Sequence, residues 1–108
     1  MPTVTVSQKL VRVLEAFAPG EDLETKLENM TRERLESQLR TCNEALRGFE
    51  TKYGMPFAEF AQAWRADKIP QRHAHEVERD FMEWEARHME QTDLLTAVQE
   101  LSRPTSES

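Results

Sequence analysis

The fold is decided by residues 35–53, which read LESQLRTCNEALRGFETKY. Apolar residues recur there at alternating steps of four and three, which gives a seven-residue repeat: Leu35, Leu39, Cys42, Leu46, Phe49 and Tyr53. Such a repeat predicts a helix with a narrow apolar stripe that packs against another helix. Gly54 follows directly and is placed to end this helix in the left-handed backbone conformation.

A second stripe with the same spacing lies closer to the C-terminus. Its members are Val77, Phe81, Trp84, His88, Gln91, Leu95 and Val98. Two matching stripes joined by a short segment predict an all-α protein built on an antiparallel helical hairpin. The second long helix should begin near His75 and run to about Ser102.

The segment between the two stripes predicts a short helix that caps the hairpin. Pro56 suits the first turn of that helix, and Ile69-Pro70 ends it. Its apolar face consists of Phe57, Phe60, Ala61 and Trp64. Phe81 and Trp84 fall near the same bend. These aromatic side chains form either the core of the closed end or, in part, an exposed anchor for a partner.

The N-terminal segment carries two shorter patterns. Thr3-Val4-Thr5-Val6 is either a frayed terminus or a short strand that pairs with its copy in a second subunit. Ser7 can then cap a helix that ends at Pro19-Gly20 and has an apolar face of Leu10, Val13, Leu14 and Phe17. Thr31 favours a new helix over residues 31–53, and one long helix whose stripe shifts near Thr31 is the alternative.

We therefore expect three parts along the chain. Residues 1–30 form an N-terminal dimerisation segment with a strand and short helices, residues 31–102 form the helical hairpin, and residues 103–108 form a disordered tail. A chain of 108 residues buries only a limited core. We expect a homo-oligomer, because self-association would cover apolar residues that the hairpin leaves exposed.

Composition excludes several classes of function. The net charge of −6 argues against generic phosphate binding, which needs clustered Lys and Arg. One cysteine allows no intramolecular disulfide, and no apolar run approaches the length of a membrane span or a signal sequence, so we expect a cytoplasmic protein. The glycines are isolated and form no phosphate-binding loop, and no catalytic template is matched. We expect neither enzymatic activity nor a cofactor.

Acidic residues concentrate in the last predicted helix: Glu76, Glu78, Asp80, Glu83, Glu85, Glu90, Asp93 and Glu100. They form either a solvated face or a surface that binds a basic protein, because complementary charge speeds association and adds specificity. The candidates for partner binding are Asp80, Glu83 and Glu90, with Trp64 or Trp84 as the aromatic anchor. A nuclease would be a suitable partner, since it must be basic to hold its substrate.

One pair of residues raises the alternative of a metal site. Glu85 and His88 form Glu-x-x-His, the spacing with which ferritin-like bundles direct two ligands into their core. A full site also needs carboxylates from neighbouring helices, whereas the predicted hairpin places Cys42 opposite His88. The ordinary interpretation is a hydrogen-bonded histidine on the contact stripe, and we predict no metal.

Two parts of the chain resemble known families. KYGMPFAEF at residues 52–60 and VERDFMEWE at residues 77–85, together with Trp64 and Ile69-Pro70, resemble small helical proteins of bacteria and archaea encoded beside putative toxin genes. The Thr3-Val4-Thr5-Val6 segment and the helix after it resemble the start of ribbon-helix-helix antitoxins.

Together these resemblances imply an antitoxin whose C-terminal helices neutralise a toxin. They also imply a dimerising N-terminal part with operator DNA as a further ligand, contacted by Thr3, Thr5 and Lys9. Two alternatives stay open. One is a homo-oligomeric helical bundle without a toxin partner, and the other is a ferritin-like bundle whose metal site on Glu85 and His88 is completed across subunits.

Overall fold

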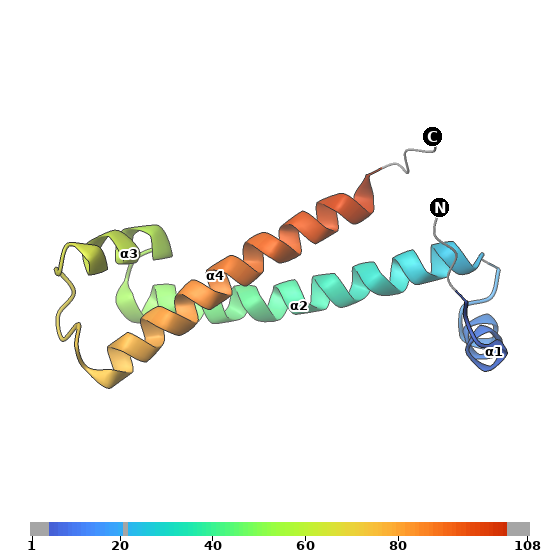
Figure 1. Cartoon of the computed structure of the whole chain (residues 1–108), viewed down its shortest axis with the longest axis horizontal. Coiled ribbons are helices and arrows are strands. Elements are labelled where there is room, and N and C mark those ends of the chain that lie inside the picture. The colour runs from blue at the N-terminus through green and yellow to red at the C-terminus, as the bar shows by residue number, and fades with distance from the viewer. Residues whose placement is uncertain (1–4, 21, 104–108) are drawn as a thin grey trace. The chain divides into compact units, whose positions relative to one another are not determined.

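The computed structural model of the chain describes residues 5–20 and 22–103, and its secondary structure there is entirely helical (Figure 1). The elements are α1 (Gln8–Phe17), α2 (Leu23–Tyr53), α3 (Phe57–Arg65) and α4 (His75–Ser102). The prediction of an all-α protein is confirmed. The chain divides into two compact units, one that ends at Arg34 and one that begins at Leu35, so α2 contributes residues to both. None of the helices described is both long and apolar enough to span a membrane.

Helix α1 begins where its capping residue predicts. The backbone N–H of Leu10 donates a 3.2 Å hydrogen bond to the Ser7 hydroxyl oxygen, which satisfies one of the free donors at the helix start. Leu14 is the buried residue of this helix. The other apolar residues of the predicted face are exposed: Leu10, Val13 and Phe17. The first unit therefore buries little of the face that its sequence provides.

The predicted N-terminal strand is not part of the described structure. Residues 5–7 adopt no regular secondary structure, and residues 1–4 lie outside the described part of the chain. The strand therefore stays a prediction.

Helix α2 is continuous from Leu23 to Tyr53, so the prediction of a new helix at Thr31 is wrong. Thr31 does not interrupt the helix, because its hydroxyl donates to the carbonyl oxygen of Leu27 at 2.7 Å, one turn earlier. The cap lies instead at Asp22, whose Oδ1 accepts a 2.9 Å hydrogen bond from the backbone N–H of Thr25. Hydrogen bonding to the Thr25 side chain, followed by the bond from its backbone N–H, holds the pKa of Asp22 below its usual value.

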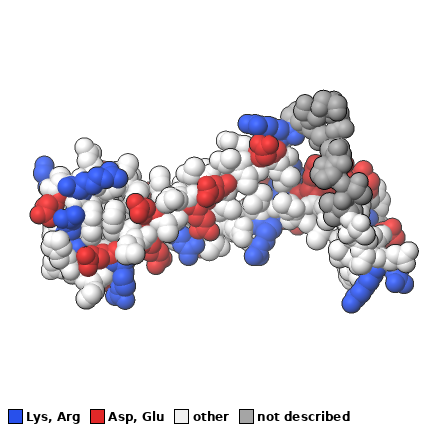
Figure 2. All heavy atoms as spheres, viewed as in Figure 1, with Lys and Arg blue, Asp and Glu red and all other residues white. Residues whose placement is uncertain are grey.

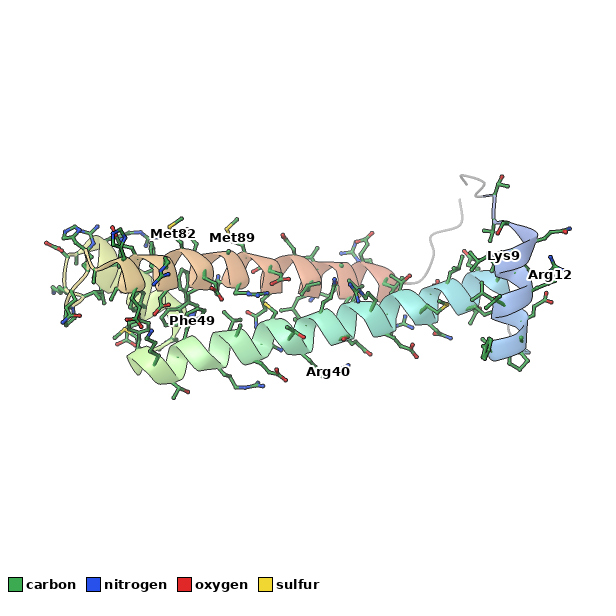
Figure 3. The ribbon with its side chains drawn as sticks, turned by 90° about the horizontal axis from the view of Figure 1, so that it is seen from below. Lys9, Arg12, Arg40, Phe49, Met82 and Met89 are labelled. Carbon is green, nitrogen blue, oxygen red and sulfur yellow. The ribbon has the colours of Figure 1, made fainter. Side chains whose placement is uncertain are left out.

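Residues 35–53 of α2 lie beside α4 (Figures 1 and 3). The side-chain contacts pair Tyr53 with Asp80, Phe49 with Trp84, Asn43 with Gln91 and Cys42 with Arg87. The residue number therefore falls along α2 as it rises along α4. The buried core of the second unit consists of Cys42, Leu46, Phe60, Ile69, Trp84 and Leu94.

Aromatic rings fill the end of the second unit where α2, α3 and α4 meet. We call the following residues the aromatic cluster: Phe49, Tyr53, Phe57, Phe60, Trp64, Phe81 and Trp84. Their contacting ring centroids lie between 4.4 and 6.1 Å apart, the range in which aromatic rings attract. Phe60 and Trp84 are fully buried, and full burial of a large apolar side chain stabilises a fold by roughly 1.5–3 kcal/mol. The cluster is therefore the main apolar support of α3.

Helix α4 presents two faces to its neighbours, where the sequence predicted one stripe. Phe81 and His88 contact α3, with their ring centroids 6.0 and 4.9 Å from that of Phe57. Contacts with α2 come from Asp80, Arg87 and Gln91. In the part of α4 that lies beyond α3, Leu94 is buried and only 9% exposed, whereas Leu95 is 43% exposed. The assignment of His88 and Leu95 to the α2 contact stripe is therefore wrong, because α3 and α2 occupy different sides of α4.

The turns follow local rules. Gly54 has φ of +69°, a left-handed conformation that favours glycine, as predicted. Pro56 directly precedes α3, with φ −72° and ψ 161°, one residue before the position expected for it. Helix α4 begins at His75 and ends at Ser102, which confirms the predicted bounds.

Candidate functional site

The middle of α4 carries carboxylates that point into solvent. Glu83, Glu85 and Asp93 are exposed. Glu90 is half-buried and accepts a 2.9 Å hydrogen bond from Arg87. On the face seen in Figure 2, acidic side chains follow the middle of α4. We call Glu83, Glu85, Glu90 and Asp93 the acidic surface of α4.

Asp80 is not part of this surface, and its contact with a partner stays a prediction. Its carboxylate accepts hydrogen bonds from Lys52 Nζ at 2.6 Å and from the Tyr53 hydroxyl at 2.5 Å. Lys52 also contacts Glu76 at 2.7 Å. A partner would have to displace these contacts to reach Asp80. The carboxylate instead ties the end of α2 to the beginning of α4.

Lys52, Tyr53 and Asp80 change one another's pKa values. Burial, followed by the hydrogen bond to Asp80, raises the pKa of Tyr53 to about 12. Partial burial alone would raise the pKa of Asp80, but hydrogen bonds from Lys52 and Tyr53 outweigh it and hold that pKa below its usual value. Hydrogen bonds to Asp80 and then Glu76 raise the pKa of Lys52. At neutral pH all three pKa shifts favour the protonation states in which Lys52 and Tyr53 donate to Asp80 in the folded protein.

The two tryptophans differ in how a partner could reach them. Trp84 is 0% exposed and stacks on Phe49 at 5.5 Å, so it is a core residue and its predicted role as an anchor is corrected. Trp64 is half-buried. Its ring stacks on Phe81 at 4.4 Å, and the Arg72 guanidinium lies 4.9 Å from its centroid. Trp64 therefore retains some accessible surface, although neighbours of its own chain cover much of the ring.

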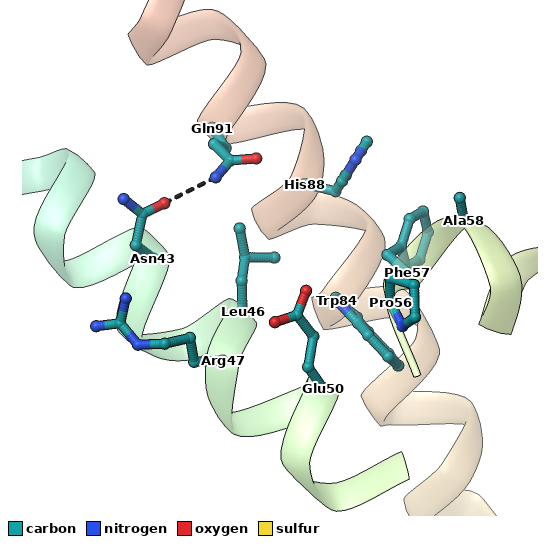
Figure 4. Close-up of a pocket in the computed structure, with 10 residues that line it drawn as sticks. All are labelled: Asn43, Leu46, Arg47, Glu50, Pro56, Phe57, Ala58, Trp84, His88 and Gln91. Atoms are coloured by element: carbon teal, nitrogen blue, oxygen red, sulfur yellow. Dashed lines mark hydrogen bonds between the residues drawn. The ribbon is translucent and has the colours of Figure 1, made fainter. Parts of the chain in front are cut away.

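A polar pocket of about 370 Å³ lies between α2, α4 and the start of α3 (Figure 4). Its lining is Asn43, Leu46, Arg47, Glu50, Pro56, Phe57, Ala58, Trp84, His88 and Gln91. A 2.8 Å hydrogen bond from Gln91 to Asn43 joins the two long helices beside it. The indole N–H of Trp84 is buried and has no hydrogen-bond partner among the described residues. The pocket thus interrupts the apolar packing with amide and charged groups.

The predicted alternative of a metal site receives no geometric support. In the part of the chain that the structure describes, no three His, Cys, Asp or Glu side chains are grouped so that they could hold a metal ion. Glu85 and His88 are both exposed, and His88 packs against the Phe57 ring at 4.9 Å. Cys42 is buried, and its Sγ donates to the carbonyl oxygen of Arg87 at 3.1 Å. Burial, followed by the nearby Glu90 carboxylate, raises the pKa of the Cys42 thiol and disfavours the reactive thiolate.

The residues predicted to contact DNA are only partly described. Thr5 and Lys9 are exposed, and Thr3 lies outside the described residues. Operator binding by these residues stays a prediction.

Sequence reasoning missed the group formed by Lys52, Tyr53, Glu76 and Asp80. The signal was present: Lys52 and Tyr53 end one predicted helix, and two acidic residues four apart begin the next. Ends of helices joined through a bend meet in space, so opposite charges placed there can pair. The exposed Met82 and Met89 of α4 were also passed over.

Comparison with protein-family models, with curated proteins and with solved structures gave no match.

Proposed function

We propose that this chain is a non-catalytic, antitoxin-like protein that binds a basic protein toxin through the acidic surface of α4. The proposal takes an antiparallel hairpin of α2 and α4, capped by α3, as the scaffold. Contacts whose residue numbers fall along α2 and rise along α4 support that scaffold. The aromatic cluster holds its closed end, and the buried side of α4 keeps the acidic surface on the outside.

The observation that carries this proposal is the solvent exposure of three carboxylates on α4. Glu83, Glu85 and Asp93 are exposed and form no salt bridge within residues 5–20 and 22–103. Because these side chains are exposed, the apolar packing of α4 does not require them. A surface of this kind attracts a basic partner and accelerates its association at low salt.

The test is purification of the tagged protein from its native host, with identification of whatever it retains. Wild type is compared with Glu83→Lys/Glu90→Lys and with a matched control, Glu36→Lys/Glu44→Lys, which changes two exposed carboxylates of α2. We expect wild type and control to retain the same basic protein and the α4 variant to lose it. A chain that comes out alone, an acidic partner, or equal retention by all three proteins would contradict the proposal.

Self-association is a second candidate, and observations on the first unit favour it. Its exposed large apolar residues are Leu10, Val13, Phe17, Leu27 and Met30. Val13, Phe17 and Met30 also line a hollow of about 510 Å³ within that unit. An apolar face of this kind with so little buried beneath it is typical of a surface that another chain covers. We propose that a second copy of this chain covers it, which makes the antitoxin-like protein a homo-oligomer.

A further inference from the structure

Helix α4 also carries an exposed apolar stripe. Met82 and Met89 are 68% and 61% exposed, and in Figure 3 both side chains point away from α2. Ala86 lies between them and is exposed as well, so the three residues follow one another at steps of four and three. That spacing places them on one side of the helix. We call Met82, Ala86 and Met89 the methionine stripe.

The acidic surface borders the methionine stripe on both sides. With 3.6 residues per turn, Glu83 and Glu90 fall along one edge of the stripe and Glu85 along the other. A shallow hollow of about 380 Å³ continues it, lined by Ala86, Met89, Glu90, Asp93 and Leu94. Three apolar side chains and two carboxylates therefore line this hollow. Methionine suits such a surface, because its flexible, polarisable side chain adapts to the shape of a bound partner.

From this arrangement we propose that the methionine stripe and the acidic surface together dock one basic amphipathic helix of a protein partner. Steps of four and three on α4 match the apolar repeat of a helix that packs alongside it. Lysines and arginines that flank the partner's apolar stripe would meet the carboxylates at both edges. The inference rests on the proposed function and adds the shape of the partner segment to its charge.

Charge complementarity favours a foreign helix over a second copy of this chain. The amphipathic helix that a second copy offers is α1, which carries Lys9 and Arg12 but also Glu15. Two cations and one anion leave a net charge of only +1. The acidic surface, with four carboxylates beside Arg87, complements a more strongly basic segment.

The test uses two synthetic probes and calorimetry on the full chain at physiological salt. One probe is a Leu/Lys peptide whose leucines share one face of a helix, and the other is its scrambled isomer with the same charge. The variants are Met82→Gln/Met89→Gln and, as control, Leu95→Gln, an exposed apolar residue on the opposite side of α4. Glutamine has nearly the helix propensity of methionine, so the fold is retained.

We expect wild type to bind the amphipathic probe about tenfold or more tightly than the scrambled one, with a negative heat-capacity change. Met82→Gln/Met89→Gln should lose that preference, and Leu95→Gln should keep it. Equal binding of both probes by wild type, or an unchanged preference in the double variant, would overturn the proposal. A chain that dimerises through the methionine stripe, with the dimer lost in the double variant, would overturn it as well.

The charge variant separates this inference from the proposed function. Glu83→Lys/Glu90→Lys should weaken both probes if the acidic surface binds basic partners. If it does so while the methionine variant changes nothing, the docking of an amphipathic helix fails and the electrostatic proposal stands. If it changes neither probe, the proposed function fails with it.

Discussion

At the scale of single residues, the contact between Tyr53 and Asp80 links the two long helices. It is a hydrogen bond of 2.5 Å between residues 27 positions apart in the chain. Lys52 shares the same carboxylate, so one acidic side chain satisfies two donors from the last turn of α2. Because one partner is a phenol and another an ammonium group, this contact responds to pH at the alkaline end.

The single tyrosine of the chain allows a direct test. We predict that Tyr53 ionises with a pKa of about 12 in the folded protein, because burial and then the hydrogen bond to Asp80 disfavour the phenolate. Asp80→Asn should lower this pKa part of the way towards the ordinary value of about 10, since burial remains. Tyrosinate absorbance during an alkaline titration measures it. Ionisation of the wild-type residue near 10 would contradict the contact.

The raised pKa of Tyr53 also determines how the stability of the fold depends on pH. A phenol whose pKa is raised in the folded state binds more protons there than in the unfolded state between about pH 10 and 12. The stabilisation is therefore complete below about pH 10 and is lost as the pH rises through that window. The lowered pKa of Asp80 acts at the other end, where its stabilisation is lost as the pH falls below about 4.

At the scale of elements, two glycines of similar surroundings should respond in opposite ways to alanine. Neither Gly48 nor Gly54 has any atom within 4 Å of the position that a Cβ would occupy. Gly54→Ala should destabilise by about 1–2 kcal/mol, because φ of +69° is strained for alanine. Gly48→Ala, inside α2, should stabilise by about 0.5–1 kcal/mol. Denaturant unfolding measures both, and changes of the same sign would refute the assigned end of α2.

A neighbouring pair of leucines tests which side of α4 faces α2. Leu94→Ala should destabilise by about 2–3 kcal/mol, because this side chain is 9% exposed within the core. Leu95→Ala should cost less than about 1 kcal/mol, since Leu95 is 43% exposed. Thermal or chemical unfolding of the two variants decides the matter. A larger effect at Leu95 would restore the stripe that the sequence predicted.

Local signals predicted some helix ends and missed others, since α3 ends at Arg65, before the predicted Ile69-Pro70. Ser7 caps the start of α1 and Gly54 follows α2 with a positive φ, and both features depend on a few neighbouring residues. The prediction at Thr31 failed because a threonine hydroxyl can either accept from a backbone N–H of a following helix or donate to a carbonyl oxygen one turn earlier. Only the structure shows that Thr31 does the second.

The candidate site was less predictable, because it depends on which neighbour each side of α4 meets. A seven-residue pattern gives the apolar side of a helix but does not separate contacts with α2 from contacts with α3. That is why the sequence predicted Leu95 on the contact stripe. For the same reason it predicted Trp84 and Asp80 on the surface, although both side chains contact α2. Glu83 and Glu90 stayed on the outside, and their contact with a partner remains a prediction.

At the scale of the whole molecule, the exposed apolar face of the first unit predicts self-association. Phe17 is 85% exposed, an unfavourable position for a phenylalanine in water unless another surface covers it. We expect sedimentation equilibrium at micromolar concentration to give a dimer or higher oligomer, and Phe17→Ser to shift it towards the monomer. A wild-type mass equal to one chain would contradict this prediction.

The central claim is that the carboxylates of α4 touch a basic partner, and zero-length carbodiimide cross-linking tests it most directly. The reagent joins a carboxylate to a lysine amine only where the two are in contact. Applied to the protein purified with its partner from the native host, it should link Glu83, Glu85, Glu90 or Asp93 to partner lysines. Links that arise only from carboxylates elsewhere in the chain, such as Glu36 or Glu44, would contradict the claim.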